Sequence, residues 1–389
     1  MWETWREEMR TWEQSRWRQW YEEHEQRSRA KDEWWRREAE EQRRRLAEKL
    51  RPSEDSKQDS EQHMELYRQD ALEHPSEAQR AHEQQESIRR QEVSAYPTLP
   101  LRHHADLHHL DRRSQQQEPV TVGFGPAGDA LVVWEHGGEG AVQVSHHAPD
   151  GTPGTITPVP PQPHRSEVQP LPDGQILLAS ARCRRDEDDD NAAVYDDTGR
   201  LVRTAHVGDA IQHLLSTASG EVWTSYFDEG VFAWSGLSTH GLVRFGTDLT
   251  PQWRYPQKRQ PDLPVIDDCY ALNVTGETAW AYAYDAFHLV SAEGQHAHDH
   301  GQVPFRGANA LLVDGDRAAL IGGYPAERHV ITPLHITPEG LRLAGPPRRL
   351  TMPDGQPLPR ARYTGRGPEL HVAVGATWYR LDLDDITPP

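Results

Sequence analysis

The chain is 389 residues long, 35% hydrophobic, and carries a formal charge of −19 at pH 7. A strongly acidic chain repels phosphate backbones, which argues against general nucleic-acid binding. The two cysteines, Cys183 and Cys269, cannot build a disulfide framework and favour a reducing compartment. The N-terminus has Glu3, Glu7 and Glu8 where a signal peptide needs basic residues, and no apolar run approaches the ~20 residues of a membrane span. We therefore expect a soluble, cytoplasmic protein.

The apolar residues are distributed unevenly along the chain. Residues 1–118 carry 22 Lys/Arg and 27 Asp/Glu and few aliphatic side chains, whereas the remainder carries 20 Lys/Arg and 34 Asp/Glu and most of the Val, Ile, Leu and Gly. Only the second part can bury a sizeable core. We predict three parts: a helix over 1–50, a polar and partly helical linker or strap over 51–118, and a folded domain over 119–389.

The first 50 residues contain no Gly or Pro and are rich in good helix formers. On a helical wheel their tryptophans gather on one stripe, with an early three-and-four spacing typical of a coiled-coil seam. The residues that define this stripe are Trp2, Trp5, Trp12, Trp20 and Trp34. The prediction is a long amphipathic helix that mediates association.

Exposed indoles on one stripe need a partner, because each carries a large apolar area. Self-association or packing on the protein's own domain is the first hypothesis, and docking into another protein's groove is the second. Attachment to a membrane surface is disfavoured, because the polar face has 13 basic and 13 acidic residues and is neutral.

From residue 119 onward, a short strand, a glycine turn and a second apolar strand recur. Glycine is favoured in such turns because tight hairpins require positive φ. The turns fall at residues 126–129, 172–174, 218–221, 274–277, 314–316 and 365–367. Their glycines are 46, 46, 56, 39 and 52 residues apart, which suits propeller blades with variable loops.

The repeat predicts an all-β propeller of about six blades, preceded by the helical Trp/Glu/Arg-rich segment. A blade needs four strands, and the last unit ends after three, near Leu383. A strand from residues 97–118 could close the ring. An array of β-sandwiches is the structural alternative.

Three stretches also carry a resemblance to a known family: residues 226–230 (YFDEG), 241–245 (GLVRF) and 267–274 (DDCYALNV). They resemble a family of uncharacterised bacterial β-propeller-like (WD40-like) proteins. The resemblance covers about residues 165–325 and excludes the tryptophan-rich segment. It implies a propeller, but the family brings no activity to carry over.

Four carboxylates are the strongest candidates for a ligand or metal site: Asp228, Glu229, Asp267 and Asp268. They flank strands of neighbouring units, so blade packing could bring them to one rim, where they would bind a hard cation or a basic ligand. The alternative is that they are exposed loop charges. A second set of candidates is aromatic, and blade packing would explain these residues equally well: Tyr226, Tyr270 and Tyr284.

Histidines supply a weaker metal hypothesis. His296, His298 and His300 alternate, so a strand would place all three imidazoles on one face, where they could bind zinc. The chain has no Gly-x-Ser-x-Gly elbow, phosphate loop or dinucleotide fingerprint. We therefore expect no cofactor other than a divalent cation.

The leading hypothesis is a non-enzymatic binding or scaffold protein, whose propeller rim or channel holds a ligand or partner. The alternative is a divalent-metal-dependent propeller lyase or hydrolase with carboxylates at the channel mouth. Metal analysis of the purified protein separates the two, because the enzyme needs a stoichiometric metal.

Self-association through the tryptophan stripe gives a direct test. Deleting residues 1–50 should lower the molar mass measured by light scattering by more than the mass of the deleted segment, because the indoles would no longer join copies. A mass per particle that changes only by the deleted residues would contradict self-association.

Overall fold

The computed structural model describes residues 77–107, 118–135, 142–160, 166–183, 189–233, 236–257, 262–303 and 305–386. The chain divides into two compact units: residues 1–96 with Pro325–Glu327, and Pro97–Tyr324 with Arg328–Pro389. The tryptophan stripe predicted over residues 1–50 lies outside the described residues. No helix in the described part is long and apolar enough to cross a membrane.

In the first unit the described elements are helix α4 (Glu77–Ser94) and the short 3-10 helix η4 (Pro325–Glu327). Helix α4 begins two residues after Pro75, within the segment predicted to be polar and partly helical. Arg89 forms ion pairs with Glu92, at 2.9 Å, and with Glu327.

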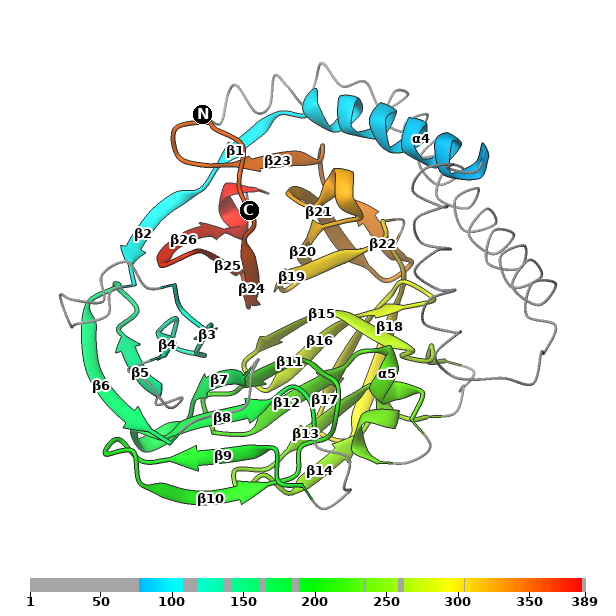
Figure 1. Ribbon diagram of the computed structural model, residues 1–389. Coiled ribbons are helices and arrows are strands. Elements are labelled where there is room, and N and C mark those ends of the chain that lie inside the picture. Colours follow the sequence, from blue (N-terminus) through cyan, green and yellow to red (C-terminus); the bar gives the residue numbers. More distant parts are fainter. Residues whose placement is uncertain are drawn as a thin grey trace, which may run out of the picture. The chain divides into compact units, whose positions relative to one another are not determined.

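The second unit is a six-bladed all-β propeller, as the repeat predicts (Figure 1). Four blades are four-stranded antiparallel sheets whose strands follow chain order. Blades 1 and 2 consist of β3 (Thr121–Phe124), β4 (Ala130–Glu135), β5 (Val142–His147), β6 (Pro153–Val159), β7 (Ser166–Pro170), β8 (Ile176–Ser180), β9 (Ala192–Tyr195) and β10 (Leu201–Ala205). Blades 3 and 4 consist of β11 (Ile211–Ser216), β12 (Val222–Tyr226), β13 (Leu242–Phe245), β14 (Pro251–Arg254), β15 (Asp268–Thr275), β16 (Thr278–Tyr284), β17 (His288–Glu293) and β18 (His296–Gln302).

The last two blades each take a strand from the N-terminal side of the propeller unit. Blade 5 has β19 (Ala308–Asp314), β20 (Arg317–Gly322), β21 (Val330–Thr337), β22 (Gly340–Leu343) and β23 (Arg348–Thr351), and β1 (Thr98–Pro100) pairs in parallel with β23. Blade 6 has β24 (Arg362–Arg366), β25 (Glu369–Val374) and β26 (Thr377–Asp382), and β2 (Arg102–Asp106) is its fourth, outermost strand.

Ring closure follows from that last pairing. Blade 6 has only three strands of its own before the 3-10 helix η5 (Leu383–Asp385), and β2 supplies the fourth, with Arg102 opposite Arg380. This confirms that the last unit lacks one strand, and the strand that completes it lies within residues 97–118, as expected. The propeller unit therefore begins at Pro97, ahead of the predicted boundary at residue 119.

Burial along the strands explains the sequence pattern. Second strands such as β8 and β12 are buried at every position, because both faces of a blade pack on neighbouring blades, and they therefore read as continuous apolar runs. The outer strand β10 has no fully buried position. All six predicted turn glycines adopt positive φ: Gly128, Gly174, Gly220, Gly276, Gly315 and Gly367.

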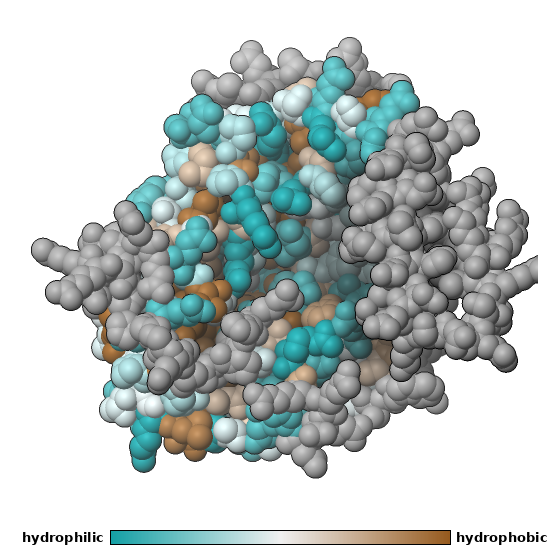
Figure 2. Space-filling model, viewed as in Figure 1, coloured by the Kyte–Doolittle hydropathy of each residue, from teal (hydrophilic) through white to brown (hydrophobic). Residues whose placement is uncertain are grey.

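The first strand of each blade lies nearest the middle of the propeller (Figure 1). These strands are β3, β7, β11, β15, β19 and β24, and most contact the first strand of the next blade. Figure 2 shows hydrophilic side chains over this middle region, where the surface is hollowed between the blades.

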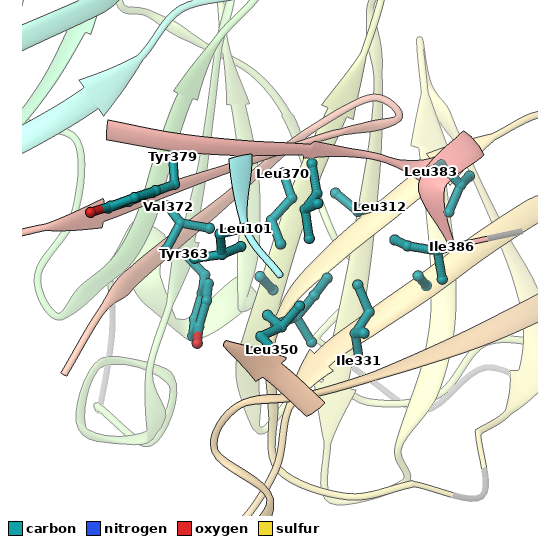
Figure 3. Packing of buried hydrophobic residues seen from close by; sticks show 14 of the residues in the cluster. Leu101, Leu312, Ile331, Leu350, Tyr363, Leu370, Val372, Tyr379, Leu383 and Ile386 are labelled. Atoms are coloured by element: carbon teal, nitrogen blue, oxygen red, sulfur yellow. The ribbon is translucent and has the colours of Figure 1, made fainter. Parts of the chain in front are cut away.

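Apolar cores fill the spaces between blades. The core between blades 5 and 6 contains Leu312, Ile331, Leu370 and Val372, and Leu101 from the segment between β1 and β2 joins it (Figure 3). The N-terminal strands therefore contribute to the core as well as to the sheet edges.

A substitution at Leu101 measures how much the N-terminal segment contributes to the stability of the closed ring. Leu101 is 1% exposed, so Leu101→Ala should lower the free energy of unfolding by about 2–4 kcal/mol through lost burial and a residual cavity. Leu201→Ala is the matched control, since Leu201 is 51% exposed and its truncation should change stability by about 0.5 kcal/mol or less. Urea denaturation followed by tryptophan fluorescence measures both, and equal effects would contradict the assigned role.

Candidate functional site

A cavity of about 250 Å³ lies at the centre of the propeller. Residues from the first strand of all six blades line it, so only the closed ring forms it. The lining residues with polar side chains are Glu167, Gln169, Gln212, His213, Asn309, Arg362, Tyr363 and Thr364. Its volume is just below the ~300–1,000 Å³ of drug-sized ligand sites, which suits a smaller molecule.

One end of the cavity is sealed by a buried guanidinium. Arg366, at the end of β24, is 6% exposed and donates to Phe124 O of blade 1 at 2.8 Å and to Ser216 O of blade 3 at 2.7 Å. It also donates to the side-chain oxygen of Gln169 in blade 2. Burial lowers the pKa of Arg366 to about 9, and Asp129 opposes that shift. One side chain therefore joins four blades.

Asn273 completes the seal across the other blades. From β15 it donates to Leu311 O of blade 5 at 2.7 Å and to Gly367 O of blade 6 at 2.9 Å, and it accepts from Gly367 N at 2.9 Å. Together, Arg366 and Asn273 connect all six blades at the end where the first strands finish.

The strands come close enough for these bonds because glycines face the neighbouring backbone. A Cβ on Gly123 would lie 1.7 Å from Val168 O, and one on Gly365 would lie 1.9 Å from Leu311 O. No side chain fits at either position without moving the strands apart.

The cavity opens at the other end, where the first strands begin. Gln212, Asn309 and Arg362 are exposed near the start of their strands, whereas Gln169 and Arg366 farther along are buried. The cavity is therefore a blind hole with its polar side chains near the mouth.

The two blades next to blade 1 each place one charged side chain in this cavity, and the two charges are opposite in sign. Glu167 on β7 is partly buried, and burial raises its pKa while the Arg362 charge opposes the rise. Arg362 on β24 donates to the Thr121 hydroxyl of β3. Within the described part of the chain, no ion pair of 4.0 Å or less joins Glu167 to Arg362, so the two charges interact across the cavity.

Blades 3, 4 and 5 present a different wall, because their first strands each carry a β-bulge. The register shifts leave Gln212, Tyr270 and Asn309 without a partner on the second strand. A bulge re-aims a side chain and recurs beside binding sites. Gln212 and Asn309 line the cavity, so this wall offers neutral amides.

His213 adds no charge to the cavity. Its Nε2 lies 3.2 Å from Tyr270 O and must carry the hydrogen, because a carbonyl only accepts. Burial lowers the pKa of His213 to about 4, so the ring is neutral at pH 7.

The structure brings the predicted carboxylates only partly together. Asp228 and Glu229 begin the short helix α5 (Asp228–Val231), and Glu229 pairs with Arg182. Asp268 lies at the start of β15, where burial and the Asp228 charge raise its pKa to about 7. Asp267 has a pKa raised by burial and by Asp285. None of these four lines the cavity itself.

The predicted tyrosines separate into core and surface residues. Tyr226 is fully buried and donates to Val207 O at 2.5 Å, so it packs the core and no ligand reaches it. Tyr270 and Tyr284 stack with ring centroids 5.4 Å apart, and Tyr284 is exposed. Blade packing accounts for Tyr226, and a partly exposed aromatic pair remains in blade 4.

The alternating histidines lie on β18, the outer strand of blade 4. The rings of His298 and His300 are 4.6 Å apart, while His300 stacks on Trp280 and lies 2.9 Å from the Ser291 hydroxyl. Within the residues that the structure describes, no group of three or more His, Cys, Asp or Glu side chains is arranged to hold a metal ion.

Sequence reasoning missed the cavity residues themselves. Each of these residues lies five to eight positions before a turn glycine, at or near the start of a first strand: Glu167, Gln212, Asn309 and Arg362. A polar residue repeated at that place in several units is the available signal. The sequence pattern places Arg366 in a turn, but it belongs to β24 and its side chain points into the ring.

The fold and this cavity define a six-bladed β-propeller protein with a blind, polar central hole. No protein-family model and no curated protein matches the sequence. Solved structures similar to this chain are β-propeller proteins at low identity.

Three of them illustrate the range. A gluconolactonase from Xanthomonas campestris is 12% identical, with 74% of this chain and 87% of that chain covered and a TM-score of 0.38. Apo AztD from Citrobacter koseri is 15% identical, with 69% and 70% covered and a TM-score of 0.40. The β-propeller domain of Swd1 from Myceliophteria thermophila is 10% identical, with 69% and 84% covered and a TM-score of 0.39.

The raised pKa of Asp268 predicts that the free energy of unfolding depends on pH. Its folded-state value of about 7 exceeds the ordinary 3.8, so the folded protein binds more protons between these values and loses stability as pH rises through them. Asp268→Asn removes this loss, and its urea midpoint should exceed that of the wild type by more at pH 8 than at pH 5. Asp316→Asn, in an exposed turn, is the control, and a pH-independent difference for Asp268→Asn would contradict the assignment.

Proposed function

We propose that the protein is a non-enzymatic binding protein whose propeller takes a small polar ligand into the central cavity. The observation that carries this proposal is the blind polar hole: six blades line it, Arg366 and Asn273 seal one end, and exposed polar side chains surround the other. Such a site needs no rearrangement to receive a ligand, which favours affinity by preorganisation.

The groups in the cavity suit recognition more than covalent chemistry. The described lining offers amides, hydroxyls, one carboxylate, one guanidinium and a neutral imidazole. The Tyr363 hydroxyl lies 2.6 Å from His329 Nδ1, but burial raises the pKa of Tyr363 and thereby disfavours the phenolate that covalent catalysis would require.

The tryptophan-rich N-terminal segment would then add association with a second copy or with a protein partner. The net charge of −19 supports a protein that does not bind nucleic acid, and a cytoplasmic location remains our expectation.

A second function, a divalent-metal-dependent lyase or hydrolase, is favoured by one observation. The carboxyl group of Asp268 has a pKa of about 7, close to the pH at which a general acid or base works best. A stoichiometric metal in the purified protein would support this alternative.

Filling the cavity tests the binding function even while the ligand is unidentified. The full chain is incubated with a polar metabolite extract, desalted and denatured, and the released small molecules are identified by mass spectrometry. The wild type should enrich a polar molecule, and Gln212→Trp should reduce that enrichment at least about tenfold, because the indole would occupy the hole.

Gln356→Trp is the matched control, because Gln356 is exposed in the loop that follows β23 and does not line the cavity. It should enrich the molecule as the wild type does. Absence of any enriched molecule in the wild type, or equal enrichment by Gln212→Trp, would contradict the proposal.

A further inference from the structure

We infer that the cavity ligand is a small zwitterion of the α-amino acid type, with its carboxylate on Arg362 and its ammonium group on Glu167. This inference rests on the proposed binding function and names the class of ligand.

The first step is the placement of the two charges. Glu167 on β7 and Arg362 on β24 lie on the two blades that flank blade 1, and both line the cavity. Thr121 of blade 1 accepts a hydrogen bond from Arg362 and thereby holds the guanidinium on this side. Within the described residues no hydrogen bond or ion pair reaches the Glu167 carboxylate, which leaves it able to accept from a ligand.

The second step is that the two groups do not neutralise each other directly. An ion pair of 4.0 Å or less between them is absent from the described residues, although each charge lies in the field of the other. Two opposite charges held apart in one small cavity match a molecule that carries both signs. Each contact would be a charge-assisted hydrogen bond, which is about twice as strong as a neutral one.

The third step excludes other sources of charge in the cavity. Arg366 already donates to Phe124 O, Ser216 O and Gln169, so its hydrogen bonds are committed to the seal. His213 is neutral. The cavity therefore presents one free cation and one free anion among its described lining residues.

The opposite wall explains where the rest of the ligand would lie. Gln212 and Asn309, re-aimed by bulges, offer amides that both donate and accept hydrogen bonds. These groups suit a polar side chain. The volume of about 250 Å³ suits a single amino acid.

Other ligand classes fit less well for electrostatic reasons. A simple anion would meet the Glu167 carboxylate, and a simple cation would meet the Arg362 guanidinium. A neutral polyol would displace water from both charges without replacing it by an opposite charge, which costs affinity.

The experiment titrates the full-length protein at pH 8 with each of the twenty protein L-amino acids by calorimetry. The best binder is then compared with its N-acetyl derivative, which lacks the ammonium group, and its carboxamide, which lacks the carboxylate. Each derivative should bind at least about tenfold more weakly than the parent.

Two variants assign the charges. Glu167→Gln should weaken binding of the parent amino acid and abolish the difference in affinity between the parent and its N-acetyl derivative. Arg362→Gln should likewise weaken binding of the parent and abolish the difference in affinity between the parent and its carboxamide. Arg360→Gln, at an exposed loop position outside the cavity, should bind as the wild type does.

The outcomes separate this inference from the binding function. If no amino acid binds, or if the blocked derivatives bind as well as the parent, the zwitterion inference is wrong. If the wild type then still enriches another molecule from the extract, the proposed binding function remains supported. If it enriches no molecule, the binding function and the zwitterion inference are both wrong.

Discussion

The ring depends on a set of hydrogen bonds made by two buried side chains, Arg366 and Asn273. Where the first strands converge, backbone carbonyls such as Phe124 O, Ser216 O and Leu311 O point toward the axis and away from bulk water. A buried carbonyl without a donor costs free energy comparable to a lost hydrogen bond. A guanidinium with five N–H donors is suited to satisfy several at once, and one amide satisfies the rest.

This seal carries a penalty that the fold must offset. Burial lowers the pKa of Arg366 to about 9, which shows that its charged form is less stable there than in water. The hydrogen bonds to three other blades offset that loss only while the ring is closed. Closure, in turn, depends on β2 pairing with β26. A strand near the start of the propeller unit therefore supports the hydrogen bonds of Arg366, which lies near its end.

The same arrangement creates the cavity. Since the bonds of Arg366 and Asn273 close one end, water and ligands reach the axis from the other, where Glu167 and Arg362 lie. The bulges of blades 3 and 5 direct Gln212 and Asn309 into the hole, while the regular strands of blades 2 and 6 supply the charges. The cavity is thus asymmetric although the blades repeat.

Local physical chemistry, readable from the sequence, determined the repeating parts. Turn glycines indicate positive φ, and apolar runs indicate strands buried on both faces. A last unit that stops near Leu383 indicates that one strand of its blade comes from elsewhere in the chain. These features depend on neighbours a few residues away, so the six blades and the incomplete last one were predictable.

Only the tertiary structure decided which polar residues meet at the axis. Glu167 and Arg362 are 195 positions apart, and their proximity depends on ring closure and strand register. Gln212 and Asn309 line the cavity because a bulge shifts each by one position, which residue type alone does not show. The carboxylates chosen from the sequence lie outside the cavity because Asp228 and Glu229 follow a second strand and Asp267 and Asp268 lie where β15 begins, whereas the cavity is lined by other first-strand residues that come together only in the closed ring.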